Sequence, residues 1–354
     1  MIAVINSKLM NDLVRKRSTI VIRLPNWVGD IVMVTPSLRN LKNTYPDKQF
    51  IATGRANCFD VLRSNQIFDD FVIKPSKQAG MGAYLSYIQE LHRYNHAASL
   101  LYTNSFSTAW DFFLARFPIR MGYKNEMREF VLTHSLVKEK VAMDQYYAKL
   151  TKAFGAEITA KNLEINFDEQ SIRIFNIVEK KYQIKPDDII IGLNPGAGFG
   201  ETRKWLKHHF VALAKLIDHS FPNIKFFIFG GPGDEERADF ISKEIGDKAI
   251  NLSRESLGLH NIKPFFDRMQ LFVTGDSGLR WYSLSMNKPT IVLFGSSDPN
   301  LTHCFLDNFY PVRNKVHCSP CKNRICPTDF ACMKDLMPNK VLNLIKELKN
   351  KHVW

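Results

Sequence analysis

The sequence predicts an α/β fold class with two parallel sheets covered by helices. Short continuous apolar runs alternate with helix-patterned segments along most of the chain, which is typical of parallel sheets. The alternation is interrupted around residues 165–188, and the chain's 354 residues exceed the ~150 of a typical single domain. We therefore expect two doubly wound, Rossmann-like domains, residues 1–170 and 171–354.

In the first domain, strand-type runs are separated by segments whose apolar residues recur at helical spacing. Strands are expected at residues 19–24, 49–54, 68–74, 97–103 and 119–123, and helices at 35–45, 83–94 and 108–117. The preceding segment, MIAVINSKLMNDLVRKRS, lacks the basic, apolar and small-residue order of a signal peptide. We expect it to be a short leader and the protein to be cytoplasmic.

The second domain repeats the pattern after the polar segment KKYQIKPDD. Its alternating segments are residues 189–196, 205–221, 225–231, 235–246, 248–253, 261–269, 271–278, a short helix, and 290–297. The last helical pattern, residues 338–350, begins with proline and is compatible with packing on either domain, including back on the first. Two such domains that face each other form a cleft at the carboxyl ends of their strands, where these folds bind ligands.

The charge balance predicts anionic partners. The formal net charge is +13 and the pI is about 9.4. Because the basic residues are spread along the chain, they fit either an ordinary solvated surface or a face that meets an anionic membrane. No nucleic-acid-binding motif is present, so nucleic acid is not an expected partner. No segment reaches the ~20 consecutive apolar residues of a membrane-spanning helix.

The first ligand-binding candidate is NPGAGFGETRKW, residues 194–205, which follows an expected strand and precedes a helix that starts near Trp205. Its glycines, including Gly196, let the backbone approach a ligand, and a helix N-terminus offers free N–H groups to anions. Arg203 and Lys204 add positive charge at the same place. The alternative interpretation is a glycine-rich turn with surface cations.

The second candidate is VTGDSGLRW, residues 273–281, in which a strand is expected to end at Asp276 and Ser277 and Gly278 to open a helix. These residues either present donors to a phosphate or cap the helix without touching a ligand. Two such loops in one domain favour a ligand that carries a diphosphate. In FGGPGDEERA, residues 229–238, the acidic side chains either bind a ribose or form the acidic first turn of a helix.

Four clustered cysteines, in the segment CSPCKNRICPTDFAC, are the third candidate. They are Cys318, Cys321, Cys326 and Cys332. The CxxC half fits a structural zinc site, but the second half, CxxxxxC, is looser than the usual zinc-binding spacing. Two interpretations stay open: a structural zinc ion, or thiols that are reduced in the cell and form disulfides on isolation.

Together these motifs resemble those of the ADP-heptose:lipopolysaccharide heptosyltransferases, glycosyltransferase family 9, and of the heptosyltransferase II branch in particular. The resemblance extends from about Thr19 to Lys346. The matching segments are LPNWVGDIVMVTPSL, TNSFSTAWDFFLARFPIRMGYKNEMR, MDQYYAKLTKAFG, LNPGAGFGETRKW, TGDSGL and CSPCKNRICP. Each segment alone is weak, but their order and spacing together are specific.

The resemblance implies a GT-B fold and an inverting transfer of heptose that needs no cofactor. It implies an ADP-heptose donor in the second domain and a lipid A–inner core acceptor in the first, at the anionic cytoplasmic face of the inner membrane. Asp30 would be the general base, because a carboxylate can take the proton of the attacking acceptor hydroxyl. The donor-binding residues would be Gly196, Ala197, Arg203, Lys204, Glu235, Asp276, Ser277, Gly278 and Leu279.

The resemblance also implies the acceptor-binding residues Asn26, Gly29, Arg120, Lys124 and Arg128. The three cations among them either contact phosphates of the inner core or are solvated charges on a loop.

Two positions depart from the family pattern. Lysine is usual two positions before Trp205, where this chain has Arg203, and arginine keeps the charge with a different donor geometry. The family's DSGLxH motif has histidine where this chain has Trp281. Two alternatives therefore stay open: a GT-B transferase that uses another nucleotide-sugar, and an inactive family member that only binds.

Overall fold

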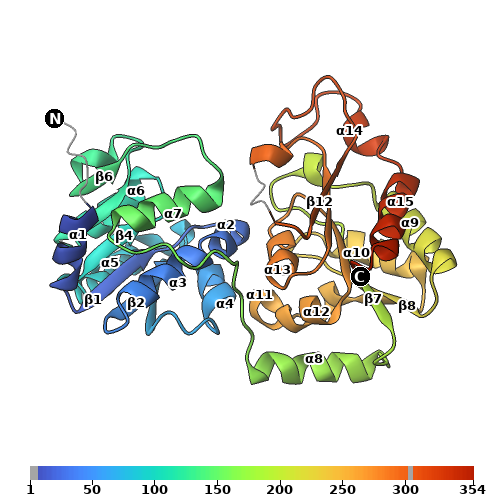
Figure 1. Cartoon of the computed structure of the whole chain (residues 1–354), viewed down its shortest axis with the longest axis horizontal. Coiled ribbons are helices and arrows are strands. Elements are labelled where there is room, and N and C mark those ends of the chain that lie inside the picture. The colour runs from blue at the N-terminus through green and yellow to red at the C-terminus, as the bar shows by residue number, and fades with distance from the viewer. Residues whose placement is uncertain (1–6, 302–305) are drawn as a thin grey trace. The chain divides into compact units, whose positions relative to one another are not determined.

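Each half of the chain builds a parallel six-stranded sheet flanked by helices (Figure 1), which confirms the predicted fold class. This computed structural model describes residues 7–301 and 306–354. The chain divides into two units, Met1–Asn166 and Phe167–Trp354, which we call unit 1 and unit 2.

Unit 1 has the sheet order β3-β2-β1-β4-β5-β6. Its strands are β1 Thr19–Arg23, β2 Gln49–Gly54, β3 Asp70–Ile73, β4 Ala98–Leu101, β5 Ile119–Tyr123 and β6 His134–Leu136. Its helices are α1 Ser7–Arg15, α2 Val28–Met33, α3 Thr35–Thr44, α4 Ala56–Leu62, η1 Lys77–Ala79, α5 Gly80–His92, α6 Phe106–Leu114, η2 Arg128–Phe130 and α7 Met143–Ala153. Strands β1 and β4 are buried along their whole length, as expected for the centre of a sheet covered on both faces.

Unit 2 has the sheet order β12-β11-β10-β7-β8-β9. Its strands are β7 Ile189–Asn194, β8 Ile224–Ile228, β9 Ala249–Asn251, β10 Leu271–Gly275, β11 Thr290–Phe294 and β12 Phe309–Arg313. Its longer helices are α8 Glu169–Lys181, α9 Lys207–Ser220, α10 Glu235–Ile245 and α15 Pro338–Asn350. Its shorter helices are η3 Glu201–Arg203, η4 Leu252–Arg254, α11 Gly258–Asn261, α12 Lys263–Arg268, α13 Arg280–Ser285, η5 Pro299–Leu301 and α14 Ala331–Lys334.

Both sheets reverse their strand order at one point, between β1 and β4 in unit 1 and between β7 and β10 in unit 2. Doubly wound sheets bind their ligands beyond the carboxyl ends of the strands at this reversal. Asp30 follows β1, and the loops that begin at Pro195 and Asp276 follow β7 and β10. The topology therefore places the candidate base and both glycine-containing loops at ligand-binding edges of their own sheets.

The segment expected to be a leader contains α1, which the sequence analysis did not predict. Met10 and Val14 are buried, and Asn11 Nδ2 donates a hydrogen bond to the Gly155 carbonyl at 2.7 Å. Within this segment, residues 1–6 lie outside the described chain. The leader prediction is thus wrong for residues 7–15, which form an integral helix of unit 1.

Two element boundaries in unit 2 also differ from expectation. The helix expected from Trp205 begins at Lys207, because the Trp205 ring lies in the core and its Nε1–H donates to the Leu336 carbonyl at 2.8 Å. The strand expected to end at Asp276 ends at Gly275, and α13 begins at Arg280. Ser277 and Gly278 therefore precede the helix rather than open it.

The last helix belongs to the core of unit 2. Four buried side chains of α15 (Val341, Leu342, Ile345 and Leu348) join the core cluster that includes Leu213 of α9, and the two helices are in contact. None of the helices in residues 7–301 and 306–354 is both long enough and apolar enough to cross a bilayer.

Candidate functional site

Asp30 lies in the first turn of α2, and its carboxyl group is half-buried. The Tyr147 hydroxyl donates a hydrogen bond to Asp30 Oδ1 at 2.9 Å. Burial raises the pKa of Asp30 above its ordinary value, while the hydrogen bond from Tyr147 acts in the opposite direction. A partly buried carboxylate with a raised pKa and one directed hydrogen bond has the properties of a general base.

Tyr147, on α7, positions Asp30 and was missed by the sequence analysis. Its ring packs edge-on against Tyr102, with centroids 5.6 Å apart. Burial and the neighbouring Asp30 raise the pKa of Tyr147 well above its ordinary value, so the hydroxyl remains a donor. The adjacent Tyr146 donates to Asn104 Oδ1 at 2.8 Å. The sequence signal was the tyrosine pair in MDQYYAKLTKAFG, whose partners only the fold reveals.

Asn26 and Gly29 flank the turn that carries Asp30. Asn26 Oδ1 accepts a hydrogen bond from Arg23 Nη2 at 2.8 Å, and the Asn26 carbonyl accepts one from Asn57 Nδ2 at 3.1 Å. Gly29 is buried within α2. The amide oxygen of Asn26 therefore already serves the buried Arg23 guanidinium, which shapes the turn beside Asp30.

The three candidate acceptor cations of unit 1 differ in exposure. Arg128 is fully buried: its Nε donates to the Tyr123 carbonyl at 2.8 Å, and its Nη1 donates to the Thr103 carbonyl. Burial lowers the pKa of Arg128 to about 10. The description of Arg128 as a solvated loop charge is therefore wrong, since its guanidinium braces the loops that follow β4 and β5.

Arg120 is partly buried and is likewise held by main-chain carbonyls. Its Nε donates to the Val131 carbonyl at 2.6 Å, and its Nη1 donates to that of Phe117. Lys124 is half-buried between β5 and η2. Of the three cations, Arg120 and Arg128 thus have a bracing role in this structure.

The two loops of unit 2 are joined by Asn194, the last residue of β7. Its Nδ2 donates to Ser277 Oγ at 3.0 Å, to Thr274 Oγ1 at 2.9 Å and to the Gly196 carbonyl at 3.3 Å. Ser277 and Thr274 also hydrogen-bond to each other. The helix-cap alternative for Ser277 does not describe the structure, because the residue at the cap of α13 is Leu279 and no side chain caps it.

Asp276 lies between two arginines. Its Oδ2 pairs with Arg203 Nη1 at 2.9 Å and its Oδ1 with Arg280 Nη1 at 2.8 Å, while the Asp276 side chain is only 5% exposed. Arg280 was not among the predicted site residues, although it stands inside the 273–281 motif. Its guanidinium lies over the buried Trp281 ring, 4.6 Å from the centroid. Trp281 thus supports the Arg280 side chain at the position where the family has histidine.

Lys204, the neighbour of Arg203 in the 194–205 loop, pairs with other carboxylates than Asp276. Its Nζ pairs with Glu201 at 2.8 Å and with Asp234 at 2.9 Å. Asp234 also packs tightly on the first glycine of the loop, since a Cβ added at Gly196 would lie 2.2 Å from Asp234 Oδ2. Glu235 begins α10 and accepts a hydrogen bond from the Gly233 N–H at 2.8 Å, as expected of an acidic first turn.

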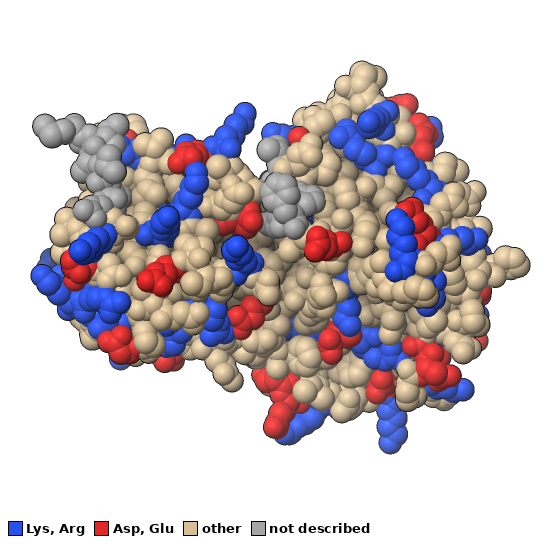
Figure 2. Space-filling view, viewed as in Figure 1, with Lys and Arg blue, Asp and Glu red and all other residues tan. Residues whose placement is uncertain are grey.

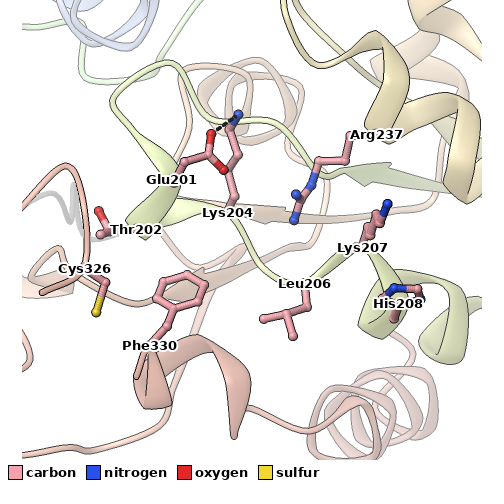
Figure 3. A pocket seen from close by; sticks show the side chains of 9 residues that line it. All are labelled: Glu201, Thr202, Lys204, Leu206, Lys207, His208, Arg237, Cys326 and Phe330. Atoms are coloured by element: carbon pink, nitrogen blue, oxygen red, sulfur yellow. Dashed lines mark ion pairs between the residues drawn. The ribbon is translucent and has the colours of Figure 1, made fainter. Parts of the chain in front are cut away.

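A pocket of about 450 Å³ opens beside Lys204 (Figure 3). Besides Lys204, its basic side chains come from Lys207 and His208 at the start of α9 and from Arg237 of α10. The lining residues are Glu201, Thr202, Lys204, Leu206, Lys207, His208, Arg237, Cys326 and Phe330. Figure 3 shows the Lys204–Glu201 ion pair on one side of the pocket.

The four clustered cysteines are not arranged as a metal site. Within the described part of the chain, no three His, Cys, Asp or Glu side chains are grouped so that they could hold a metal ion. All four thiols are unpaired; Cys318 is exposed and Cys332 is buried. Of the two interpretations that the spacing left open, the zinc site therefore finds no support in this geometry.

The cysteine segment instead packs against the loop of residues 194–205. The Thr202 hydroxyl donates to the Asn323 carbonyl, and a Cβ added at Gly200 would lie 2.7 Å from the Arg324 carbonyl oxygen. The close approach explains why glycine stands at position 200. Residues 318–326 thus help to hold the loop that carries Arg203 and Lys204.

Comparisons with known proteins show which family and which solved structures the chain is similar to. The model of Glycosyltransferase family 9 (heptosyltransferase) matches residues 84–331. Lipooligosaccharide heptosyltransferase 2 of Campylobacter jejuni subsp. jejuni serotype O:6 is 28% identical over 347 residues, which cover 93% of this chain and 98% of that protein. Lipopolysaccharide heptosyltransferase 2 of Escherichia coli K12 is 27% identical over 298 residues, 78% of this chain and 83% of that protein.

Two solved structures share the fold. E. coli ADP-heptose lps heptosyltransferase II aligns with a TM-score of 0.76 at 21% identity and covers 94% of this chain and 99% of that one. The glycosyl transferase family 9 protein of Veillonella parvula DSM 2008 aligns with a TM-score of 0.83 at 18% identity, covering 94% and 97%. These alignments confirm the predicted α/β GT-B fold class.

Proposed function

The chain belongs to glycosyltransferase family 9, and from this premise we propose that it transfers heptose from ADP-heptose to the inner core of lipopolysaccharide. It is a glycosyltransferase, and its relatives named heptosyltransferase 2 favour the heptosyltransferase II-like reaction. The structural observation that carries the proposal is Asp30, a half-buried carboxyl group with a raised pKa, hydrogen-bonded by Tyr147 beyond the first strand.

In the proposed reaction, Asp30 accepts the proton of an acceptor hydroxyl as that oxygen attacks the anomeric carbon of the heptose. The bond between this carbon and the diphosphate oxygen breaks, and ADP leaves with the electron pair. A single displacement of this kind inverts the configuration at the anomeric carbon. The hydrogen bond from Tyr147 keeps Oδ1 occupied, which leaves Oδ2 as the oxygen that takes the proton.

We assign donor binding to unit 2. Arg203 and Lys204 would stabilise the charge that grows on the leaving diphosphate. In the structure Arg203 pairs with Asp276, while Lys204 pairs with Glu201 and Asp234. Those carboxylates hold both cations in place before the donor arrives, and the diphosphate would exchange for part of these contacts.

Acceptor binding is assigned to unit 1, which carries Asn26, Gly29, Arg120, Lys124 and Arg128. Of the three cations, Lys124 would contact the acceptor, because Arg120 and Arg128 brace the surrounding loops. The acceptor would be a lipid A–inner core molecule, and the protein would act at the anionic cytoplasmic face of the inner membrane. Lys and Arg side chains are spread over the visible face of both units (Figure 2), which suits such a surface.

Two alternatives compete with this proposal. A GT-B transferase could use another nucleotide-sugar on the same scaffold. A family member that only binds is motivated by Trp281, because the usual histidine is absent; here Arg280, supported by Trp281, pairs with Asp276 in the second loop.

The direct test is transfer from ADP-heptose to heptose-deficient core by the wild-type protein and by Asp30→Ala. We expect the variant to lose at least about 100-fold in kcat, since general bases contribute on the order of 10²–10⁴. Calorimetry should show that it still binds ADP, because Asp30 lies in unit 1. Full transfer by Asp30→Ala would remove Asp30 as the base, and a clear preference for UDP over ADP would favour another nucleotide-sugar.

A further inference from the structure

One face of helix α6 is apolar and exposed. Phe106, Trp110, Phe113 and Leu114 recur at positions i, i+4, i+7 and i+8, so they lie along one side of the helix. Their exposed fractions are 37%, 38%, 42% and 39%, whereas Phe112 on the opposite side is buried in the unit 1 core. The ring of Trp110 stacks on those of Phe106 and Phe113, with centroids 5.9 and 5.2 Å apart. The stacked rings form a continuous apolar stripe.

The turn η2 and the residue before it extend this stripe. Met127 is 68% exposed and Phe130 is 76% exposed. The turn is held against the start of α6, where the Phe106 N–H donates to Glu126 Oε2 at 3.0 Å, and the two elements are in contact. We call Phe106, Trp110, Phe113, Leu114, Met127 and Phe130 together the α6 face.

Basic side chains border the α6 face. Arg116 is exposed just beyond the helix, Lys124 is half-buried before η2, and the Arg120 guanidinium lies over the Phe113 ring, 5.5 Å from the centroid. The nearby acids are Glu126, whose carboxylate accepts from Phe106, and Glu129. Aromatic rings bordered by an excess of cations are the composition that binds the headgroup region of an anionic bilayer.

The α6 face begins at the edge of the sheet where the candidate base lies. Helix α6 follows β4, which pairs in parallel with β1, and Asp30 follows β1. The carboxyl ends of the two strands therefore meet at one edge. A transferase whose acceptor is anchored in lipid must bring its base to the bilayer surface, and α6 is an exposed apolar helix that starts at this edge.

We propose that the α6 face docks unit 1 onto an anionic lipid bilayer, with its aromatic rings at the level of the headgroups. This inference rests on the proposed function only in that the acceptor is carried by lipid. The charged border favours anionic over zwitterionic lipid, and the stacked rings supply apolar area at a small cost in side-chain entropy.

The test is flotation of the full-length protein with vesicles of phosphatidylethanolamine and phosphatidylglycerol, with phosphatidylcholine vesicles for comparison. Wild-type protein should float with the anionic vesicles. Trp110→Asp and Phe130→Asp should each weaken partitioning about tenfold or more, because a charge replaces an apolar group at the interface. The matched control is Ile177→Asp, which changes an apolar residue on α8 of unit 2 that is 68% exposed, against 76% for Phe130, and it should float like wild type.

Phe130→Asp is the second variant in case Trp110→Asp disturbs the helix, since Phe130 lies outside α6 and packs least. The inference is overturned if both variants float like wild type, or if wild-type protein does not bind anionic vesicles. It is also overturned if wild-type protein is a dimer that Phe130→Asp dissociates and no vesicles are bound, because a second copy would then be the occupant. Vesicle binding needs no donor, so a wild-type protein that floats but does not transfer heptose contradicts the proposed function alone.

Discussion

At the residue scale, two opposing influences determine the pKa of Asp30. Burial disfavours its charged form and raises its pKa, and the Tyr147 hydroxyl favours the charged form by donating to Oδ1. The result is a carboxyl group with a raised pKa and one directed hydrogen bond, which are the properties that favour a general base. Tyr147 is therefore a positioning residue whose effect can be measured through Asp30.

Tyr147→Phe removes that hydrogen bond while keeping the ring. The pKa of Asp30 should rise further, so the acid limb of the pH–rate profile should move to higher pH and kcat at neutral pH should fall about tenfold. The measurement is a pH profile of heptose transfer. Tyr146→Phe is the control, because Tyr146 donates to Asn104 and not to Asp30. An unchanged acid limb in Tyr147→Phe would show that this hydrogen bond does not tune the base.

Asp30→Asn is expected to stabilise the fold while it abolishes transfer. Since burial raises the native-state pKa of Asp30, its protonated form contributes stability that is fully present below the ordinary value of 3.8 and is lost as the pH rises through the raised value. At pH 7 the neutral amide avoids this loss, and Tyr147 can still donate to its oxygen. Urea unfolding should give a higher midpoint for the variant at pH 7, and the gain should shrink as the pH approaches 3.8. A gain that does not depend on pH would contradict the argument.

At the element scale, the two glycine-containing loops of unit 2 are linked by shared side-chain contacts. Asn194 donates to groups in both loops, and Asp276 and Asp234 hold Arg203 and Lys204 in position. The contacts are made by side chains from three strand ends, so the loops keep their geometry only while those strands stay in register. A substitution in one loop should therefore change the positions of Arg203 and Lys204.

Gly196→Ala tests this coupling. The added Cβ would meet Asp234 Oδ2 at 2.2 Å, so Asp234 must move and its ion pair with Lys204 must weaken. We expect a loss of about 1–3 kcal/mol in the free energy of unfolding and weaker binding of ADP. Gly198→Ala is the matched control in the same loop, because no atom lies within 4 Å of its added Cβ. Equal effects of the two substitutions would argue against the coupling.

At the scale of the whole molecule, the two units have separate sheets and separate cores. Each sheet reverses its strand order at one point. The proposed base, Asp30, lies near the reversal of unit 1, and the loops proposed to bind the donor lie at the reversal of unit 2. The nucleotide-binding unit can therefore be identified by measuring which unit changes its hydrogen exchange when ADP is added.

ADP should protect the loops of unit 2 from hydrogen exchange. Peptides that cover residues 194–206 and 273–281 should exchange more slowly with ADP, because both loops would contact the nucleotide. The free energy of unfolding should rise by about 2.7 kcal/mol when free ADP is roughly 100 times its Kd. Hydrogen-exchange mass spectrometry provides the first measurement and urea titration the second. Protection confined to residues 26–30 would reverse the assignment of the donor to unit 2.

Local patterns in the sequence predicted most of the architecture. Largely apolar runs such as residues 19–24 and 290–297 predicted the central strands, because strands buried on both faces are rich in apolar residues. Helix α1 was missed although its apolar residues recur at helical spacing, because the segment was interpreted as a leader; its hydrogen bond from Asn11 to Gly155 joins it to unit 1. Strand β6 was missed because three residues carry too little pattern.

By itself, the sequence determined the fold class, the order of the two units and the positions of Asp30 and the two glycine-containing loops, since these depend on local periodicity and on motifs. Only the tertiary structure decided which partners those groups have. It placed Tyr147 on Asp30, buried Arg128 beneath the loops of unit 1 and set Arg280 beside Asp276. The reason is physical: burial, ion pairing and hydrogen bonding join residues far apart in the chain, so no local pattern in the sequence displays them.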